Sequence, residues 1–135
     1  MAVQALNHAN IQTVVMDASI AFFRDVLGMT VDPVPGMVSL VEGAWLYSAE
    51  GRPAIHLNAV TSATDFLGEA RPPHDVTGAG RIHHIAFDCV DYDDVDRRIA
   101  AAGLTVQRND VEALGLRQLF VRDPNGILIE LNFRG

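Results

Sequence analysis

A repeat within the sequence is the feature that most constrains how this chain can fold. Three stretches of the first half recur in the same order 74 to 76 positions later. The stretch around His8 resembles the one around His84, 27–31 (LGMTV) resembles 102–106 (AGLTV), and 56–58 (HLN) resembles 130–132 (ELN). Matches that keep their order indicate two copies of one structural unit. At 135 residues, we expect a single domain made of two modules, at about 1–60 and 81–135.

Each copy has the pattern of a β-α-β-β-β module, which predicts an α+β fold. The first strand and the helix are expected at Leu6–Thr13 and Ala18–Leu27, and again at Ile82–Val90 and Tyr92–Ala102. A glycine follows each helix, where a left-handed residue usually closes the last turn. The other expected strands are Met29–Val34, Val38–Val41, Trp45–Ser48 and Ala54–Val60, then Leu104–Gln107, Arg117–Arg122 and Ile127–Phe133.

The stretch Thr61–Gly80 separates the two copies. It is polar and contains Pro72, Pro73 and three glycines. Because it is longer than a bare turn needs to be, we interpret it as a linker, a lid or an arm.

The charge of the chain excludes several classes of partner. Acidic residues outnumber basic ones by 17 to 10, all ten bases are arginine, and there is no lysine. Binding to nucleic acid or to an anionic membrane depends on clustered positive charge, so we expect neither partner. Schiff-base chemistry and phosphate-binding P-loops need a lysine and are also excluded. The chain has one cysteine, no long apolar run and no recognisable signal peptide with a basic start and an apolar stretch. We therefore expect a cytoplasmic protein.

Four potential metal ligands lie at matching places in the two copies. Side chains two apart on a strand share a face, and one face of each first and last strand is apolar. The opposite faces carry His8, His56, His84 and Glu130. A single histidine of this kind is explained without a metal if the polar face of the sheet is simply exposed to solvent. Glu130, however, stands between Ile129 and Leu131, where a buried carboxylate must be wet, paired or metal-bound.

The chemistry of these four residues indicates a divalent transition metal. Three imidazoles and one carboxylate can bind Zn²⁺, Ni²⁺, Fe²⁺, Co²⁺ or Mn²⁺. On a six-coordinate ion they leave two positions for a small-molecule substrate or water, as a catalytic centre requires. Arg117 and Arg122 are candidates for holding a substrate carboxylate, with surface ion pairs as the alternative. We expect His83 to face away from His84, and Cys89 to be a buried apolar residue.

The sequence resembles the vicinal oxygen chelate superfamily, which contains glyoxalase, bleomycin-resistance and extradiol-dioxygenase proteins. The resemblance spans nearly the whole chain and rests on these segments: Leu6-Asn7-His8, 22–29 (FFRDVLGM), 84–87 (HIAF), and 123–126 (DPNG) followed by 129–131 (IEL). It implies two modules that form a half-open barrel around a divalent metal. It also places His8, His56, His84 and Glu130 at the four metal positions. Members of this length often form homodimers, in which the site can be built across subunits.

Within this superfamily, the resemblance leaves three functions open. The leading one is an isomerase, epimerase or lyase that stabilises an enediolate of a small oxygenated substrate, with Glu130 as metal ligand and general base. Lactoylglutathione chemistry itself is disfavoured, because His56 stands where glyoxalase normally has a glutamate. An extradiol Fe²⁺ dioxygenase is the first alternative, although Phe120 stands where those enzymes usually have a tyrosine. The second is a non-catalytic protein that binds a drug or small molecule.

Overall fold

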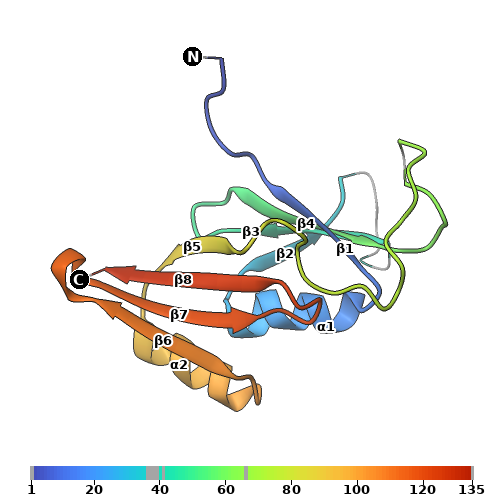
Figure 1. The fold of residues 1–135 in the computed structure, drawn as a ribbon. Helices are drawn as coiled ribbons and strands as arrows, with labels where there is room; N and C mark the ends of the chain where they lie inside the picture. Colours follow the sequence, from blue (N-terminus) through green and yellow to red (C-terminus); the bar gives the residue numbers. More distant parts are fainter. Residues whose placement is uncertain (1, 36–39, 41, 66, 135) are drawn as a thin grey trace. The chain divides into compact units, whose positions relative to one another are not determined.

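The computed structural model describes residues 2–35, 40, 42–65 and 67–134, and it divides the chain into two compact units. Unit 1 consists of residues 1–24 and 28–76, and unit 2 of residues 25–27 and 77–135. Each unit has one four-stranded sheet and one main helix (Figure 1). Among the described residues, no helix has the length and apolar character needed to span a membrane.

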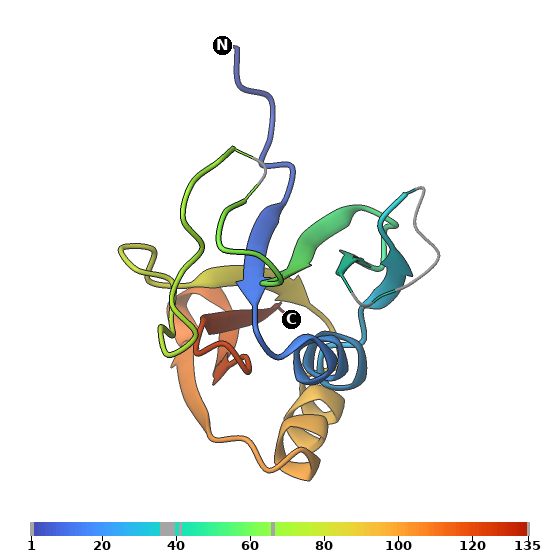
Figure 2. The same ribbon diagram turned by 90° about the vertical axis from the view of Figure 1, so that its right-hand side faces the viewer.

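Unit 1 has the strand order β1-β4-β3-β2, with β1 parallel to β4 and the other pairs antiparallel. The helix α1 continues directly into a π-helical turn, η1. The elements are β1 (Ala9–Thr13), α1 (Met16–Ala21), η1 (Phe22–Val26), β2 (Thr30–Pro33), β3 (Gly43–Tyr47) and β4 (Pro53–Ala59). The last two residues of η1 belong to unit 2. Residues 2–7 extend from the sheet as an exposed tail (Figure 2).

Unit 2 repeats this plan with the strand order β5-β8-β7-β6, in which β5 is parallel to β8. Its elements are β5 (Ile85–Cys89), α2 (Tyr92–Ala101), β6 (Val106–Val111), the short 3-10 turn η2 (Glu112–Leu114), β7 (Leu116–Arg122) and β8 (Leu128–Arg134). The pairing registers match as well, since Ala9 lies opposite Ile55 in unit 1 and Ile85 lies opposite Ile129 in unit 2. The predicted α+β fold with two similar modules is confirmed.

Several predicted boundaries are wrong by a few residues. The first strand of each unit begins at Ala9 or Ile85, three residues later than expected, so His8 and His84 lie just before the strands. The first helix begins at Met16 instead of Ala18. The strand expected at Leu104–Gln107 is instead Val106–Val111. The strand expected at Val38–Val41 falls outside the described residues, apart from Leu40.

The apolar face of each sheet forms a core with the helix of its own unit. Ile55 and Leu57 of β4 and Ile129 and Leu131 of β8 are fully buried, and α1 lies against β4. From α2, Ile99 is also fully buried. Each such side chain contributes about 1.5–3 kcal/mol by leaving water. Because these residues alternate with polar ones, the opposite face of each sheet carries the polar side chains.

The stretch between the predicted modules is ordered by its own hydrogen bonds. The Asp65 carboxylate accepts hydrogen bonds from the backbone N–H groups of Leu67 and Glu69, which closes a tight turn. Thr64 and Ala70 form an isolated β-bridge, and the Arg71 N–H donates to the carbonyl of Ala63. The described residues of 63–71 therefore form a small hairpin that returns Arg71 to the body of unit 1.

The turn between β7 and β8 is organised by a buried carboxylate. Asp123 is 4% exposed and accepts hydrogen bonds from the backbone N–H groups of Asn125 and Ile127 and from the Asn125 amide. Burial raises the pKa of Asp123, while these three hydrogen bonds act in the opposite direction. The equivalent turn of unit 1 has the same backbone hydrogen bonds around Ser48, without a buried carboxylate.

We predict that Asp123→Ala lowers the free energy of unfolding by roughly 2–4 kcal/mol, because it leaves buried N–H groups without an acceptor. Asp123→Asn retains one oxygen and should lose less. Ser48→Ala is the matched control from the equivalent turn, and we expect a change within about 0.5 kcal/mol. Urea unfolding followed by circular dichroism measures all three. Equal losses for Asp123→Ala and Ser48→Ala would show that the carboxylate does not stabilise its turn.

Candidate functional site

The four predicted metal ligands form two pairs, one in each unit, at equivalent positions. On the polar face of unit 1, His56 of β4 lies opposite Asn10 of β1. On the polar face of unit 2, Glu130 of β8 lies opposite Ala86 of β5. His8 precedes Asn10 by two residues, and His84 precedes Ala86 by two residues. The strand registers thus give the two halves of the predicted ligand set the same place in each unit.

In unit 1 the two histidines gather around the single tryptophan of the chain. Trp45 of β3 stacks on His56, with ring centroids 4.4 Å apart and an interplanar angle of 17°. The same tryptophan meets His8 edge-on at 4.7 Å, and the two imidazole centroids are 6.3 Å apart. This arrangement shields one face of the His56 ring from water.

His56 has the properties of a neutral nitrogen ligand. Burial, and then the charge of His8, lower the pKa of His56, so its imidazole is uncharged at neutral pH. The amide nitrogen Nδ2 of Asn10 lies 3.3 Å from Nδ1 of His56. A half turn of the amide exchanges its nitrogen and oxygen, and the oxygen then accepts a hydrogen bond from Nδ1–H of His56. An acceptor that holds the proton on one ring nitrogen leaves the lone pair of the other nitrogen for a metal. That other nitrogen, Nε2, is buried and has no hydrogen-bond partner among the described residues.

In unit 2, Glu130 is partly buried and paired. Its side chain is 14% exposed, and its Oε1 lies 3.7 Å from Nε2 of His84. Its Oε2 accepts a hydrogen bond from the Asn132 amide at 2.9 Å. The prediction that His83 points away from His84 is wrong, because their Nδ1 atoms lie 2.9 Å apart. These residues precede the first residue of β5, so strand alternation does not govern their side chains.

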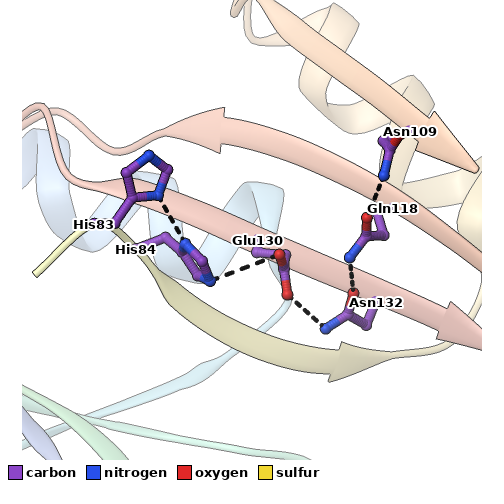
Figure 3. A network of polar contacts seen from close by, with 6 residues as sticks. All are labelled: His83, His84, Asn109, Gln118, Glu130 and Asn132. Atoms are coloured by element: carbon purple, nitrogen blue, oxygen red, sulfur yellow. Dashed lines mark hydrogen bonds and ion pairs between the residues drawn. The ribbon is translucent and has the colours of Figure 1, made fainter.

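A chain of amides leads across the second sheet to Glu130, and the sequence reading missed it (Figure 3). Asn109 of β6 donates to Gln118 of β7 at 2.7 Å, and Gln118 donates to Asn132 of β8 at 3.0 Å. An ionised carboxylate only accepts, so Asn132 must present its NH₂ group to Glu130, and this requirement orients each amide before it. Three aligned amide dipoles therefore direct N–H groups toward one oxygen of Glu130.

The first sheet has no equivalent of this amide chain. The registers place Gly43 where unit 2 has Gln118, and Asn58 where it has Asn132. The amide chain is therefore not required by the fold and occurs in the unit that carries the carboxylate. Sequence alternation contained a signal for it, because Asn109, Gln118 and Asn132 all fall on polar faces, but only the strand register joins them.

The donor atoms of each unit suit a transition metal without completing a site by themselves. Among the residues that the structure describes, no three His, Cys, Asp or Glu side chains form a metal-binding group. Each unit instead supplies two donors of suitable chemistry, two imidazoles in unit 1 and an imidazole with a carboxylate in unit 2. The orphaned Nε2 of His56 is the feature that fits an absent metal best, because buried polar atoms are rarely left without a partner.

Other side chains singled out in the sequence have structural roles. The Arg117 guanidinium lies 3.5 Å from the centroid of the Tyr92 ring, and Arg122 donates to the Gly126 carbonyl at 2.9 Å. Burial, and then the nearby Asp88 charge, raise the pKa of the Cys89 thiol to about 11. Cys89 is consequently protonated at neutral pH and is a poor nucleophile. Phe120 lies opposite Glu130 in the β7–β8 pairing and has no hydroxyl to offer it.

The fold and the paired donor positions agree with a family that the comparisons identify. The chain belongs to the Glyoxalase/Bleomycin resistance protein/Dioxygenase superfamily, whose sequence model matches residues 5–131. A search of curated proteins finds no match.

Several solved structures share the fold. A lactoylglutathione lyase from Agrobacterium tumefaciens is 22% identical, with a TM-score of 0.66 over 98% of this chain and 96% of that chain. A mutant of the fosfomycin resistance protein FosX from Listeria monocytogenes, complexed with Mn(II) and 1S,2S-dihydroxypropylphosphonic acid, is 19% identical, with a TM-score of 0.68 over 98% and 94%. An integron cassette protein from V. Cholerae is 18% identical, with a TM-score of 0.66 over 100% and 98%.

The amide chain can be tested without any ligand. We predict that Gln118→Leu lowers the free energy of unfolding by about 1 kcal/mol and shifts the side-chain amide resonances of Asn132, because Asn132 loses its donor. Gln107→Leu is the matched control, since Gln107 is an exposed glutamine on the same face of the same sheet. It should leave the Asn132 resonances in place. If Gln118→Leu also leaves them in place, the amides are not linked in solution.

Proposed function

We propose that this protein is a divalent-metal-dependent enzyme whose metal is held by His8, His56, His84 and Glu130. The observation that carries the proposal is the buried Nε2 of His56, which has no partner among the described residues and stands at the position equivalent to Glu130. Superfamily membership supports it, as does the Mn(II) complex of the structurally similar FosX. The ion is Zn²⁺, Ni²⁺, Fe²⁺, Co²⁺ or Mn²⁺, all of which accept imidazole and carboxylate ligands.

We further propose that the reaction is an isomerisation, epimerisation or lyase step on a small oxygenated substrate. When bound, the metal would polarise a substrate carbonyl and stabilise the enediolate that forms on proton loss. Glu130 is the group suited to move that proton, because Asn132 holds its Oε2 and its Oε1 remains for the exchange. Trp45, stacked on His56, limits the access of water to the ring. The lactoylglutathione lyase among the similar structures supports this class of chemistry.

The two other functions have less support. An extradiol dioxygenase usually has a tyrosine where this chain has Phe120, which lies opposite Glu130 without a hydroxyl. A protein that only sequesters a drug has no need for three imidazoles and a carboxylate at equivalent positions. Hydrogen–deuterium exchange next to the carbonyl of an α-hydroxy carbonyl compound would support the proposal. Oxygen uptake with a catechol and Fe²⁺ would overturn it in favour of the dioxygenase.

Metal binding can be followed through tryptophan fluorescence, because the chain has one tryptophan and it lies beside His8 and His56. We predict that one Co²⁺ per chain quenches Trp45, and that His56→Ala and Glu130→Gln each abolish tight binding. His74→Ala is the control, since His74 is an exposed histidine outside both pairs. Metal analysis of the purified protein checks the stoichiometry. Retention of Co²⁺ by both ligand variants would contradict the proposed ligand set.

A second fluorescent probe tests whether both units hold the same ion. Phe120 occupies in unit 2 the position of Trp45 in unit 1, so Trp45→Phe combined with Phe120→Trp moves the reporter beside Glu130. If one ion binds both pairs, the two reporters respond with the same midpoint. Glu130→Gln should then weaken the response of Trp45 itself. Different midpoints would show two separate ions and contradict a single centre.

We also propose that the protein is a homodimer, and that mixed variants reveal whether the centre is built across subunits. His56→Ala damages unit 1 and Glu130→Ala damages unit 2. If each centre combines unit 1 of one chain with unit 2 of the other, a mixed dimer contains one intact centre and one doubly damaged centre. If each centre lies within one chain, the mixed dimer has none. We expect dimers by light scattering, and metal recovery on mixing the two variants distinguishes the two arrangements.

A further inference from the structure

Two buried side-chain nitrogens without partners mark the polar side of unit 1. Among the described residues, the buried side-chain nitrogen and oxygen atoms that lack a hydrogen bond are Nε2 of His56 and Nε of Arg71. Leaving such a buried nitrogen without a hydrogen-bond partner costs about 1–3 kcal/mol. An unmade bond of this kind in a native fold calls for an explanation such as an absent ion or ligand. The proposed metal explains the atom on His56, but Arg71 is not among the proposed ligands.

Arg71 is held on the same face of the sheet as His56. It ends the small hairpin 63–71, and its Nη1 donates to Oε1 of Gln12 at 2.8 Å. Gln12 follows Asn10 by two residues on β1, so both side chains share the polar face. Asn10 contacts His56, and two residues of a strand span roughly 7 Å. The Arg71 guanidinium is therefore anchored at Gln12, which is two residues along β1 from the position that lies opposite His56.

The contact with Gln12 leaves the part of the guanidinium that is best suited to an oxyanion. Nη1 is engaged, while Nε–H and one N–H of Nη2 point in parallel along the other edge of the group. Two parallel N–H groups match the two oxygens of a carboxylate or a phosphonate. The partner at Nη1 is a neutral amide, so the charge of Arg71 has no carboxylate counterpart among its described contacts.

Most of the other arginines are occupied. Their described partners are the following: Glu50 for Arg52, Asp94 for Arg97 and Arg98, Asp96 for Arg108, the Tyr92 ring for Arg117, and the Gly126 carbonyl for Arg122. Arg117 and Arg122, the two candidates suggested by the sequence, are thus engaged elsewhere. In a chain without lysine, an anionic substrate depends on an arginine or on the metal itself.

We propose that Arg71 binds an anionic group of the substrate, a carboxylate or a phosphonate, through its Nε and Nη2 edge. The inference rests on the proposed function for the location of the reacting oxygens, but its own support is the Arg71–Gln12 contact and the orphaned Nε. It narrows the substrate class to small molecules with neighbouring oxygens at one end and an oxyanion at the other. Arg71 then selects and orients the substrate without taking part in proton transfer.

Two matched probes test this assignment on the metal-loaded protein. Both 3,4-dihydroxybutanoate and its amide offer neighbouring oxygens to a metal, but only the first carries a charge at its far end. We expect the wild type to bind the acid about ten- to a hundredfold more tightly than the amide, as measured by calorimetry. Arg71→Gln should bring the ratio close to one while binding of the amide stays the same. Arg81→Gln, at an exposed arginine of unit 2, should retain the preference.

Further variants separate binding from a merely structural role. If Arg71 only anchors the hairpin, Gln12→Leu and Arg71→Gln should lower stability alike and leave the acid-to-amide ratio unchanged, which would overturn the proposal. If Arg71 binds the anion, the acid-to-amide affinity ratio of Gln12→Leu stays above that of Arg71→Gln. Repeating the titration with 2,3-dihydroxypropylphosphonate distinguishes the two oxyanions, since the tighter of the two probes identifies the preferred group.

A metal-free measurement keeps this proposal distinct from the proposed function. The Nε–H resonance of Arg71 is identified as the one that disappears from the spectrum of Arg71→Lys. Inorganic phosphate is then titrated into the wild-type protein without metal. A saturable shift of this resonance supports the anion site even if the protein fails to retain a metal. Metal retention without any shift, and without an acid-to-amide preference in the wild type, would overturn the anion site alone.

Discussion

The pleat of two parallel strand pairs is the constraint on which the rest of the structure depends. In each unit the first strand pairs with the last, and the register sets Ala9 opposite Ile55 and Ile85 opposite Ile129. Because a strand alternates its faces, this pairing buries one row of side chains against a helix and presents the next row on the other side. A slip by one residue would bury Glu130 in the apolar layer, at a cost of several kcal/mol.

The two units use this shared frame for different chemistry. A neutral imidazole tolerates an aromatic neighbour, and His56 accordingly lies flat against Trp45. A half-buried carboxylate needs donors, and Glu130 receives one through the amides of Asn132 and Gln118. Burial lowers the pKa of His56 and keeps its imidazole in the uncharged form that binds a metal, while the Asn132 amide holds one oxygen of the Glu130 carboxylate in place. The duplication thus supplies equivalent positions, while the neighbouring strands adapt each one to its own ligand.

The proposed centre and the proposed anion site place complementary demands on a substrate. Imidazole and carboxylate donors suit an ion that binds neighbouring oxygens, and the Nε and Nη2 edge of Arg71 suits an oxyanion roughly one strand repeat away. His56 and Glu130 lie on paired strands, and Arg71 ends a hairpin with its own hydrogen bonds, so these three residues need little ordering when a ligand binds. A rigid arrangement of this kind favours orientation of one small substrate over adaptable binding of many.

The sequence by itself determined the repeat, the α+β class, the apolar and polar faces of the strands, and the equivalence of His56 with Glu130. These follow from periodicity, which depends only on local backbone geometry. The sequence did not determine which residues from separate strands or loops contact one another. The amide chain from Asn109 to Glu130 requires the register of three strands, and the approach of Arg71 to Gln12 requires the hairpin to fold back. Such contacts between residues distant in the chain have no period, so only the tertiary structure decided them.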